Sequence, residues 1–155
     1  MGLMSGKRGV IFGVANDKSI AWGIAKRLHA EGSEIAFTYL NEVFEKRVRP
    51  LAESIGSELI LRCDVTNDAE IEGVYLEIEQ RWGSLDFVVH SVAYAGREDL
   101  KQPFHRTSRE GFRVALDISA RPPARTTYSS PRRASTSSVP SGVRAVSRVS
   151  QGCMG

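Results

Sequence analysis

The stretch GVIFGVANDKSIAWGIA, Gly9 to Ala25, joins a short apolar run to an amphipathic segment through a long turn. Gly13 supplies a tight turn after the expected strand, Ser19 offers a hydroxyl near the helix start, and Gly23 is expected to let the helix pack close against the sheet. A pyrophosphate suits such a turn, because backbone N–H groups and the positive end of a helix dipole bind anions. The usual G-x-G-x-x-G pattern is missing, so this stretch alone predicts either a phosphate cradle or a plain loop.

The alternation of strand and helix continues through the first 120 residues. Further β-rich runs are separated by segments with one apolar stripe at helical spacing. Gly32 and Gly56 stand where the first two helices are expected to end, and the stretch DVTND can cap the third. This order predicts an α/β, Rossmann-type doubly wound parallel sheet, whose ligands bind at the carboxyl ends of the strands. The expected strands are RGVIF (8–12), EIAFTY (34–39), ELILRC (58–63) and LDFVVHS (85–91), followed by the helix TSREGFRVALDISA (107–120).

Two other strand ends carry residues suited to a dinucleotide. Asp64 follows the third strand, where a carboxylate can accept a hydrogen bond from the adenine amino group, although it can equally cap the next helix. The residues after the fourth strand, HSVAYAG (90–96), are small and leave room for a nicotinamide ring. His90 is interpreted as a hydrogen-bonded strand-end histidine rather than a catalyst. These strand ends strengthen the phosphate-cradle interpretation of the first turn.

Charge divides the chain near residue 120. The net charge is +3, but residues 1–120 hold 15 basic and 18 acidic residues, whereas residues 121–155 hold six arginines and no acid. The net positive charge of the chain therefore comes from residues 121–155 and says little about residues 1–120, for which no nucleic-acid partner is expected. Cys63 and Cys153 have no companions at metal-ligand or redox spacing, so no metal is expected. No apolar signal core or membrane span is evident, and a cytoplasmic protein is the default expectation.

The motifs together resemble those of the bacterial enoyl-acyl carrier protein reductases that use NADH, a divergent branch of the short-chain dehydrogenase/reductase superfamily. The resemblance covers about residues 1–120, and it rests on the long loop from Gly13 to the SIAWG stretch, on FTY (37–39), on CDV (63–65) and on TSREGF (107–112). It implies a cytosolic, homotetrameric Rossmann-fold enzyme of type II fatty-acid synthesis. Such an enzyme reduces the 2,3 double bond of an enoyl thioester carried on acyl carrier protein.

The resemblance also implies a role for each strand end. The first turn would hold the pyrophosphate, although its glycines can instead be turn and packing residues and Ser19 only a helix cap. The implied cofactor residues are Gly13, Ala15, Ser19 and Ile20 at the pyrophosphate, Leu40 at the adenosine ribose, Asp64 and Val65 at the adenine, and Ser91, Val92 and Ala93 at the nicotinamide ribose, while Ala95 falls in the acyl pocket.

The end of the second strand bears on the choice of cofactor. Leu40 and Asn41 bring no positive charge to the place where a ribose 2′-phosphate would lie. NADH is therefore favoured, although the usual ribose-binding acid is absent and the family often has glutamine at the position of Leu40. Lys46 and Arg47 lie a turn or two into the next helix, which leaves NADPH as the less favoured cofactor.

The end of the chain departs from the family pattern. The family uses a Tyr-x6-Lys pair and a second tyrosine beyond a fifth strand, whereas the last lysine here is Lys101 and Tyr128 has Ser135 at the lysine position. Residues 121–155 hold four of the six prolines and eight serines, without a periodic apolar pattern. No catalytic residue is therefore assigned, and a tetramer is doubtful for this chain.

The sequence thus predicts two parts: residues 1–120 as the N-terminal part of a dinucleotide-binding Rossmann domain, and residues 121–155 as a disordered Arg/Ser/Pro-rich tail. The tail has the composition of a GC-rich gene read out of frame, so a frameshift is the favoured explanation and a genuine basic tail for an anionic partner is the alternative. The function implied by the resemblance is an NADH-dependent enoyl reductase. A nucleotide-binding fragment without catalysis, or a short-chain dehydrogenase acting on another carbonyl or alcohol, are the alternatives.

Overall fold

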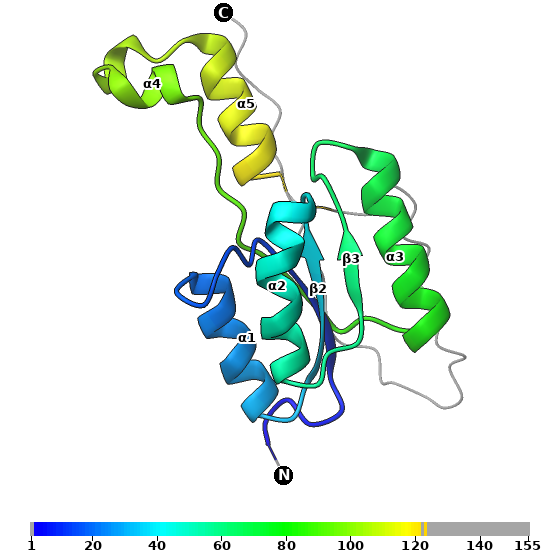
Figure 1. The fold of residues 1–155 in the computed structure, drawn as a ribbon. Helices are drawn as coiled ribbons and strands as arrows, with labels where there is room; N and C mark the ends of the chain where they lie inside the picture. Colours follow the sequence, from blue (N-terminus) through cyan, green and yellow to red (C-terminus); the bar gives the residue numbers. More distant parts are fainter. Residues whose placement is uncertain (1, 122, 124–155) are drawn as a thin grey trace, which may run out of the picture.

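The computed structural model describes residues 2–121 and 123, which form a four-stranded parallel sheet with helices on both faces (Figure 1). The strand order is β3-β2-β1-β4, so the chain crosses over the sheet to place β4 beside β1. This order is that of the first strands of a Rossmann sheet, and it confirms the predicted fold class. The elements are β1 (Arg8–Phe12), α1 (Ile20–Ala30), β2 (Glu34–Tyr39), α2 (Glu42–Ser54), β3 (Ile60–Arg62), α3 (Asp68–Trp82), β4 (Phe87–His90), α4 (Arg97–Lys101), the 3-10 helix η1 (Phe104–Arg106) and α5 (Arg109–Ser119).

The sheet separates two apolar cores. Successive side chains of a strand point to opposite faces, so β1 contributes to both cores. Ile11 packs with Phe37 beneath α1 and α2, whereas Val10 and Phe12 pack beneath α3. Because both faces are covered, the strands read as continuous apolar runs rather than as alternating ones.

Two of the helices begin at asparagine caps. The Oδ1 atom of Asn41 accepts hydrogen bonds from the N–H groups of Val43 and Phe44, at 3.1 and 3.3 Å, at the start of α2. The Oδ1 atom of Asn67 accepts from the N–H of Ala69 at 3.0 Å at the start of α3. The predicted cap in DVTND is therefore confirmed, and it fixes where the chain turns from β3 into α3.

The chain leaves the sheet after β4. In Figure 1, α4 and α5 lie beyond the carboxyl edge, apart from the helices that cover the sheet. The sequence predicted the last helix but not α4 or η1. None of the residues of α5 is buried, and Phe112 and Leu116 are 52% and 47% exposed. The apolar side of this helix is thus only partly covered by the rest of the described chain.

One predicted packing role is wrong. Gly23 is exposed, and a Cβ atom at this position would meet nothing within 4 Å. The helix α1 contacts the sheet through Ala21, Trp22 and Ala25 instead, all of which are buried. A glycine is therefore not required at position 23 for close packing.

Nearly all of the expected tail, residues 122 and 124–155, lies outside the described residues. Among the residues that the structure does describe, no helix combines the length and the apolar character needed to cross a membrane.

Candidate functional site

A cleft of about 660 Å³ lies at the carboxyl edge of the sheet. Parallel strands all end at the same edge, so the segments that follow β1, β2, β3 and β4 meet there. Asp64 is the only charged residue in the described lining, which contains no Lys or Arg. The described lining is Gly13, Val14, Ala15, Thr38, Tyr39, Leu40, Phe44, Cys63, Asp64, Val65, Thr66, Ser91, Val92, Ala93, Tyr94 and Ile118.

Most of the residues predicted for the cofactor meet in this cleft. Those that line it are Gly13, Ala15, Leu40, Asp64, Val65, Ser91, Val92 and Ala93. Ser19, Ile20 and Ala95 do not line it. Ile20 is 78% exposed, at the start of α1.

Gly13 is required by a close approach of two strand ends. Its φ is +100°, and a Cβ atom here would lie 2.2 Å from the carbonyl oxygen of Ser91 and 2.9 Å from the nitrogen of Val92. The N–H of Ser91 also donates to the carbonyl of Phe12 at 2.9 Å, which fixes the end of β1 against the end of β4. The predicted turn glycine therefore has a second function, because only glycine leaves room for the backbone on the floor of the cleft.

The loop between Gly13 and α1 is ordered by Asn16. The carbonyl of Asn16 accepts from the Oγ of Ser19 at 2.7 Å, and its Oδ1 accepts from the N–H of Lys18 at 2.9 Å. Ser19 stands at the N-cap position of α1, but its side chain does not cap the helix. The N–H groups of Trp22 and Gly23 both donate to the carbonyl of Ser19 at 3.1 Å, which leaves the N–H groups of Ile20 and Ala21 without an acceptor among the described residues. Such groups at a helix start are suited to an anion.

A second ordered loop carries Asp64 into the cleft. Its Oδ1 atom accepts from the backbone N–H of Thr66 at 2.9 Å and from the Oγ1 of Thr66 at 2.7 Å. Its own N–H donates to the Oε2 of Glu70 at 2.8 Å. Both of the bonds from Thr66 are to Oδ1, so the Oδ2 atom of Asp64 can accept another hydrogen bond while the orientation of the carboxylate stays fixed.

Two neutral groups form the adjoining wall. Burial, with smaller contributions from Glu70 and Asp64, raises the pKa of the Cys63 thiol to about 12. Burial, and next the carboxylate of Glu45, raises the pKa of Tyr39. Both side chains therefore remain protonated near neutral pH and add no charge to the cleft.

The C-terminal end of α5 borders the cleft through Ile118. The Nε2 atom of His90 lies 3.0 Å from the carbonyl oxygen of Ile118, and the N–H of Tyr94 donates to the Oγ of Ser119 at 3.0 Å. The Nδ1 atom of His90 is buried and has no partner among the described residues. The sequence predicted that His90 would be hydrogen-bonded at the end of its strand. This prediction holds for Nε2 and is wrong for Nδ1.

The sequence missed the part of the lining that comes from helices. Phe44 belongs to α2 and Ile118 to α5, and neither follows a strand. Their apolar helical spacing indicated only a buried face, with no signal for a cleft. Within the described residues, no group of three or more His, Cys, Asp or Glu side chains could hold a metal ion.

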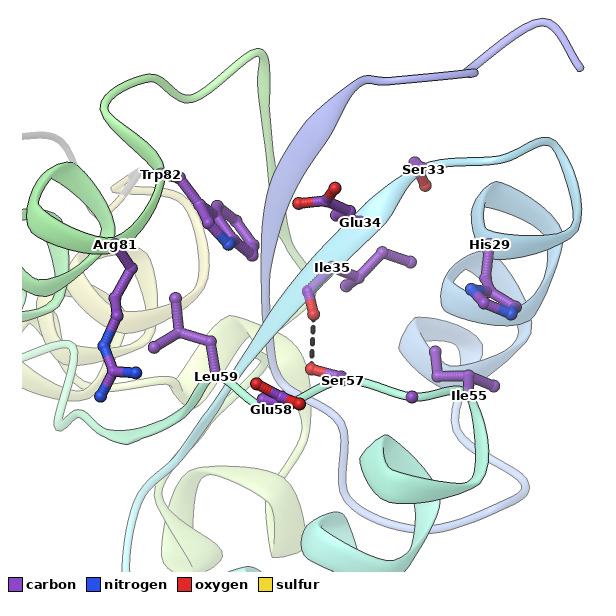
Figure 2. A pocket seen from close by; sticks show the side chains of 11 residues that line it. His29, Ser33, Glu34, Ile35, Ile55, Ser57, Glu58, Leu59, Arg81 and Trp82 are labelled. Atoms are coloured by element: carbon purple, nitrogen blue, oxygen red, sulfur yellow. Dashed lines mark hydrogen bonds between the residues drawn. The ribbon is translucent and has the colours of Figure 1, made fainter.

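A second hollow, of about 560 Å³, lies at the opposite edge of the sheet (Figure 2). There the Oγ of Ser57 donates to the carbonyl of Ile35 at 2.6 Å, which ties the loop before β3 to β2. The charges of this hollow are largely paired, since Glu34 bonds to Arg8 and Arg81 bonds to Glu77. The carboxyl-edge cleft is therefore the stronger candidate site, as expected for a parallel sheet.

A parallel sheet in this strand order, with helices on both faces and a cleft at its carboxyl edge, defines the Rossmann class of α/β proteins. The family model described as enoyl-(acyl carrier protein) reductase matches residues 13–141. The chain belongs to this family.

Individual relatives agree with this assignment. The chain is 53% identical over 119 residues to an NADH enoyl-[acyl-carrier-protein] reductase of Aquifex aeolicus, a match that covers 77% of this chain and 44% of the relative. A crystal structure of the Anaplasma phagocytophilum reductase in complex with NAD matches with a TM-score of 0.72 and 50% identity, over 76% of this chain and 45% of that one. The Bacillus cereus reductase with NADP+ and an indole naphthyridinone matches with a TM-score of 0.71 and 47% identity, over 76% and 47% of the two chains. The chain thus spans less than half the length of these relatives.

Proposed function

We propose that this chain carries the cofactor-binding part of an NADH-dependent enoyl-acyl carrier protein reductase of type II fatty-acid synthesis. The observation that carries the proposal is the cleft at the carboxyl edge, where the residues after all four strands meet in a chain of this family. Its substrate would be an enoyl thioester on acyl carrier protein. The family match favours this substrate over the other carbonyls and alcohols that short-chain dehydrogenases use.

The residues present fit a dinucleotide in shape and charge. Gly13 leaves backbone exposed where a Cβ atom would collide with Ser91, and the N–H groups of Ile20 and Ala21 at the start of α1 are the ones that could donate to a pyrophosphate. Asp64 and Val65 supply a carboxylate and a backbone N–H, which match the amino group and the ring nitrogen of adenine. Ser91, Val92 and Ala93 are the small residues beside which the nicotinamide ribose would lie.

The charge of the lining favours NADH over NADPH. A ribose 2′-phosphate is usually bound by arginine, and the described lining has neither Arg nor Lys. Arg49, on the nearby helix α2, already pairs with Glu45 at 2.5 Å. The B. cereus relative was solved with NADP+, so NADPH is the comparison that a binding experiment must include.

NADH would supply the hydride that adds to the β-carbon of the enoyl thioester. The enolate that results needs a hydrogen-bond donor and a proton, which the family takes from tyrosine with the help of lysine. The chain has no lysine after Lys101, so it has no Tyr-x6-Lys pair beyond a fifth strand, where the family has it; the same spacing at Tyr39/Lys46 and Tyr94/Lys101 lies earlier in the chain. We therefore expect this polypeptide by itself to bind NADH weakly and to reduce no enoyl thioester.

The binding test is a fluorescence titration of the 155-residue chain with NADH and with NADPH. NADH should saturate and bind more tightly than NADPH. Asp64→Ala should weaken NADH binding, whereas the control Glu58→Ala, which alters a carboxylate in the hollow at the opposite edge, should not. Equal effects of the two substitutions would refute the assignment of the cleft.

The catalytic test is oxidation of NADH with a crotonyl thioester. The chain is compared with a chimera in which residues 1–120 continue into the A. aeolicus reductase. Each missing stabilising donor costs about 100 to 1,000-fold in rate, so only the chimera should turn over. Comparable rates for the two proteins would place the chemistry within residues 1–120 and refute this part of the proposal.

We further propose that the protein is cytoplasmic and that its reading frame changes near Ala120. The match to the A. aeolicus relative covers 119 residues, and the composition changes to Arg, Ser and Pro beyond Ala120, although the family model extends to residue 141. Translating the gene in all three frames tests this proposal. A family-like fifth strand in another frame would support it, and its absence from all three frames would leave a genuine basic tail.

A further inference from the structure

Glu70 is a carboxylate that holds the loop on the adenine side of the cleft. It lies in the first turn of α3 and does not itself line the cleft. Its Oε2 atom accepts from the backbone N–H of Asp64 at 2.8 Å, and its Oε1 atom accepts from the Nδ2 of Asn67 at 3.3 Å. One side chain therefore bonds to both ends of the loop from residue 64 to residue 67.

These bonds differ from those of an ordinary helix cap. In a capping box, the acid at the third helical position accepts from the backbone N–H of the N-cap residue. Here the N-cap is Asn67, and its backbone N–H instead donates to the carbonyl of Asp64 at 3.0 Å. Glu70 thus reaches past the cap to Asp64, which lines the cleft.

The bond to Glu70 completes the fixation of Asp64. The carboxylate of Asp64 is held through its Oδ1 atom by Thr66, and the backbone of Asp64 is held through its N–H by Glu70. Hydrogen bonds to a charged acceptor are the stronger kind, and an N–H left unpaired in a partly buried position is costly. Loss of Glu70 would free this backbone and allow Asp64 and Val65 to turn away from the cleft.

We propose that Glu70 is a positioning residue for the adenine end of the cofactor, acting through the backbone of Asp64. This inference rests on the proposed function, because it assumes that Asp64 and Val65 bind adenine. Glu70 itself makes no contact with the cofactor. Its effect is to hold one acceptor and one donor in the arrangement that adenine requires.

The test compares Glu70→Ala, Glu70→Gln and the control Asp68→Ala. Glutamine keeps an oxygen that can accept from the N–H of Asp64, whereas alanine does not. Asp68 lies in the same first turn of α3 but makes no bond of its own to the loop. It bonds to Arg121, which also donates to the carbonyl of Val65 at 3.4 Å and pairs with Asp117 at 3.3 Å. Asp117 still anchors Arg121 when Asp68 is lost, so this variant reports the effect of removing a negative charge there. The measurements are the hydrogen exchange rate of the Asp64 amide and the Kd for NADH and for ADP, which carries the adenosine and the diphosphate but no nicotinamide.

Glu70→Ala should accelerate exchange at Asp64 and raise the Kd for both nucleotides about tenfold. Glu70→Gln should restore both measurements to within about twofold of the wild-type values, and Asp68→Ala should change neither. The proposal is overturned if Glu70→Ala leaves the Asp64 amide and the Kd unchanged, or if Asp68→Ala weakens binding as much. If the wild-type chain binds neither nucleotide, the proposed function and the cofactor role of Glu70 both fail, even where exchange confirms the loop contact.

Discussion

Replacement of Gly13 by alanine should destabilise the chain strongly, because the added Cβ atom both strains the backbone and clashes with Ser91. A non-glycine residue at φ +100° pays about 1–2 kcal/mol of backbone strain. The added Cβ would also lie 2.2 Å from the carbonyl oxygen of Ser91, which is backbone and cannot rotate away. Overpacking of this kind typically costs about 1–3 kcal/mol, so the free energy of unfolding should fall by about 3 kcal/mol.

Gly23→Ala is the matched control. It makes the same chemical change in the same segment, but its Cβ meets nothing within 4 Å and its position lies within α1. Alanine is favoured over glycine in a helix by about 1 kcal/mol, so this variant should be more stable than the wild type. The two substitutions therefore have opposite expected signs.

Urea denaturation and thermal unfolding, each followed by circular dichroism, measure both variants. For a domain of this size, about 1 kcal/mol shifts the Tm by about 4 °C, so Gly13→Ala should melt about 12 °C lower. It should also weaken NADH binding, because Ser91 and Val92 would be displaced. A Gly13→Ala variant within about 0.5 kcal/mol of the wild type would refute the close approach of the two strand ends.

Four other outcomes are expected. Cys63, whose pKa burial raises to about 12, should resist alkylation in the folded chain at about pH 8 and react in urea, as mass mapping of its peptide would show; rapid labelling without urea would contradict its burial. Asn41→Ala removes the cap of α2 and should lower the free energy of unfolding by about 1 kcal/mol in urea denaturation. The Lys7 ammonium beside Asp86 lowers the pKa of that carboxyl, so its stabilising contribution should be lost as the pH falls below about 4, and Asp86→Asn should flatten that part of the pH profile. The half-exposed apolar side chains of α5, Phe112 and Leu116, should cause irregular association in sedimentation, and a clean tetramer would count against this.

The sequence was sufficient for the order of elements and for the edge of the sheet at which the site lies. Strands buried on both faces leave apolar runs, and helices leave one apolar stripe, so the two could be told apart without coordinates. Once the strands are parallel, their carboxyl ends must share an edge. Gly13, Asp64 and Ser91 could therefore be predicted to meet, although they are far apart in the chain.

The tertiary structure decided the contacts between segments that are far apart in the sequence, because no local sequence pattern predicts them. The sequence assigned Gly13 to a turn and Gly23 to packing, yet only Gly13 faces another backbone and Gly23 faces open space. It also gave no sign that Ile118 would reach the cleft, or that Glu70 would bond to the N–H of Asp64 rather than to the cap of its own helix. Periodicity and capping motifs describe neighbours along one element, whereas these distances depend on how separate elements pack, and that is fixed only when the whole sheet and its helices are assembled.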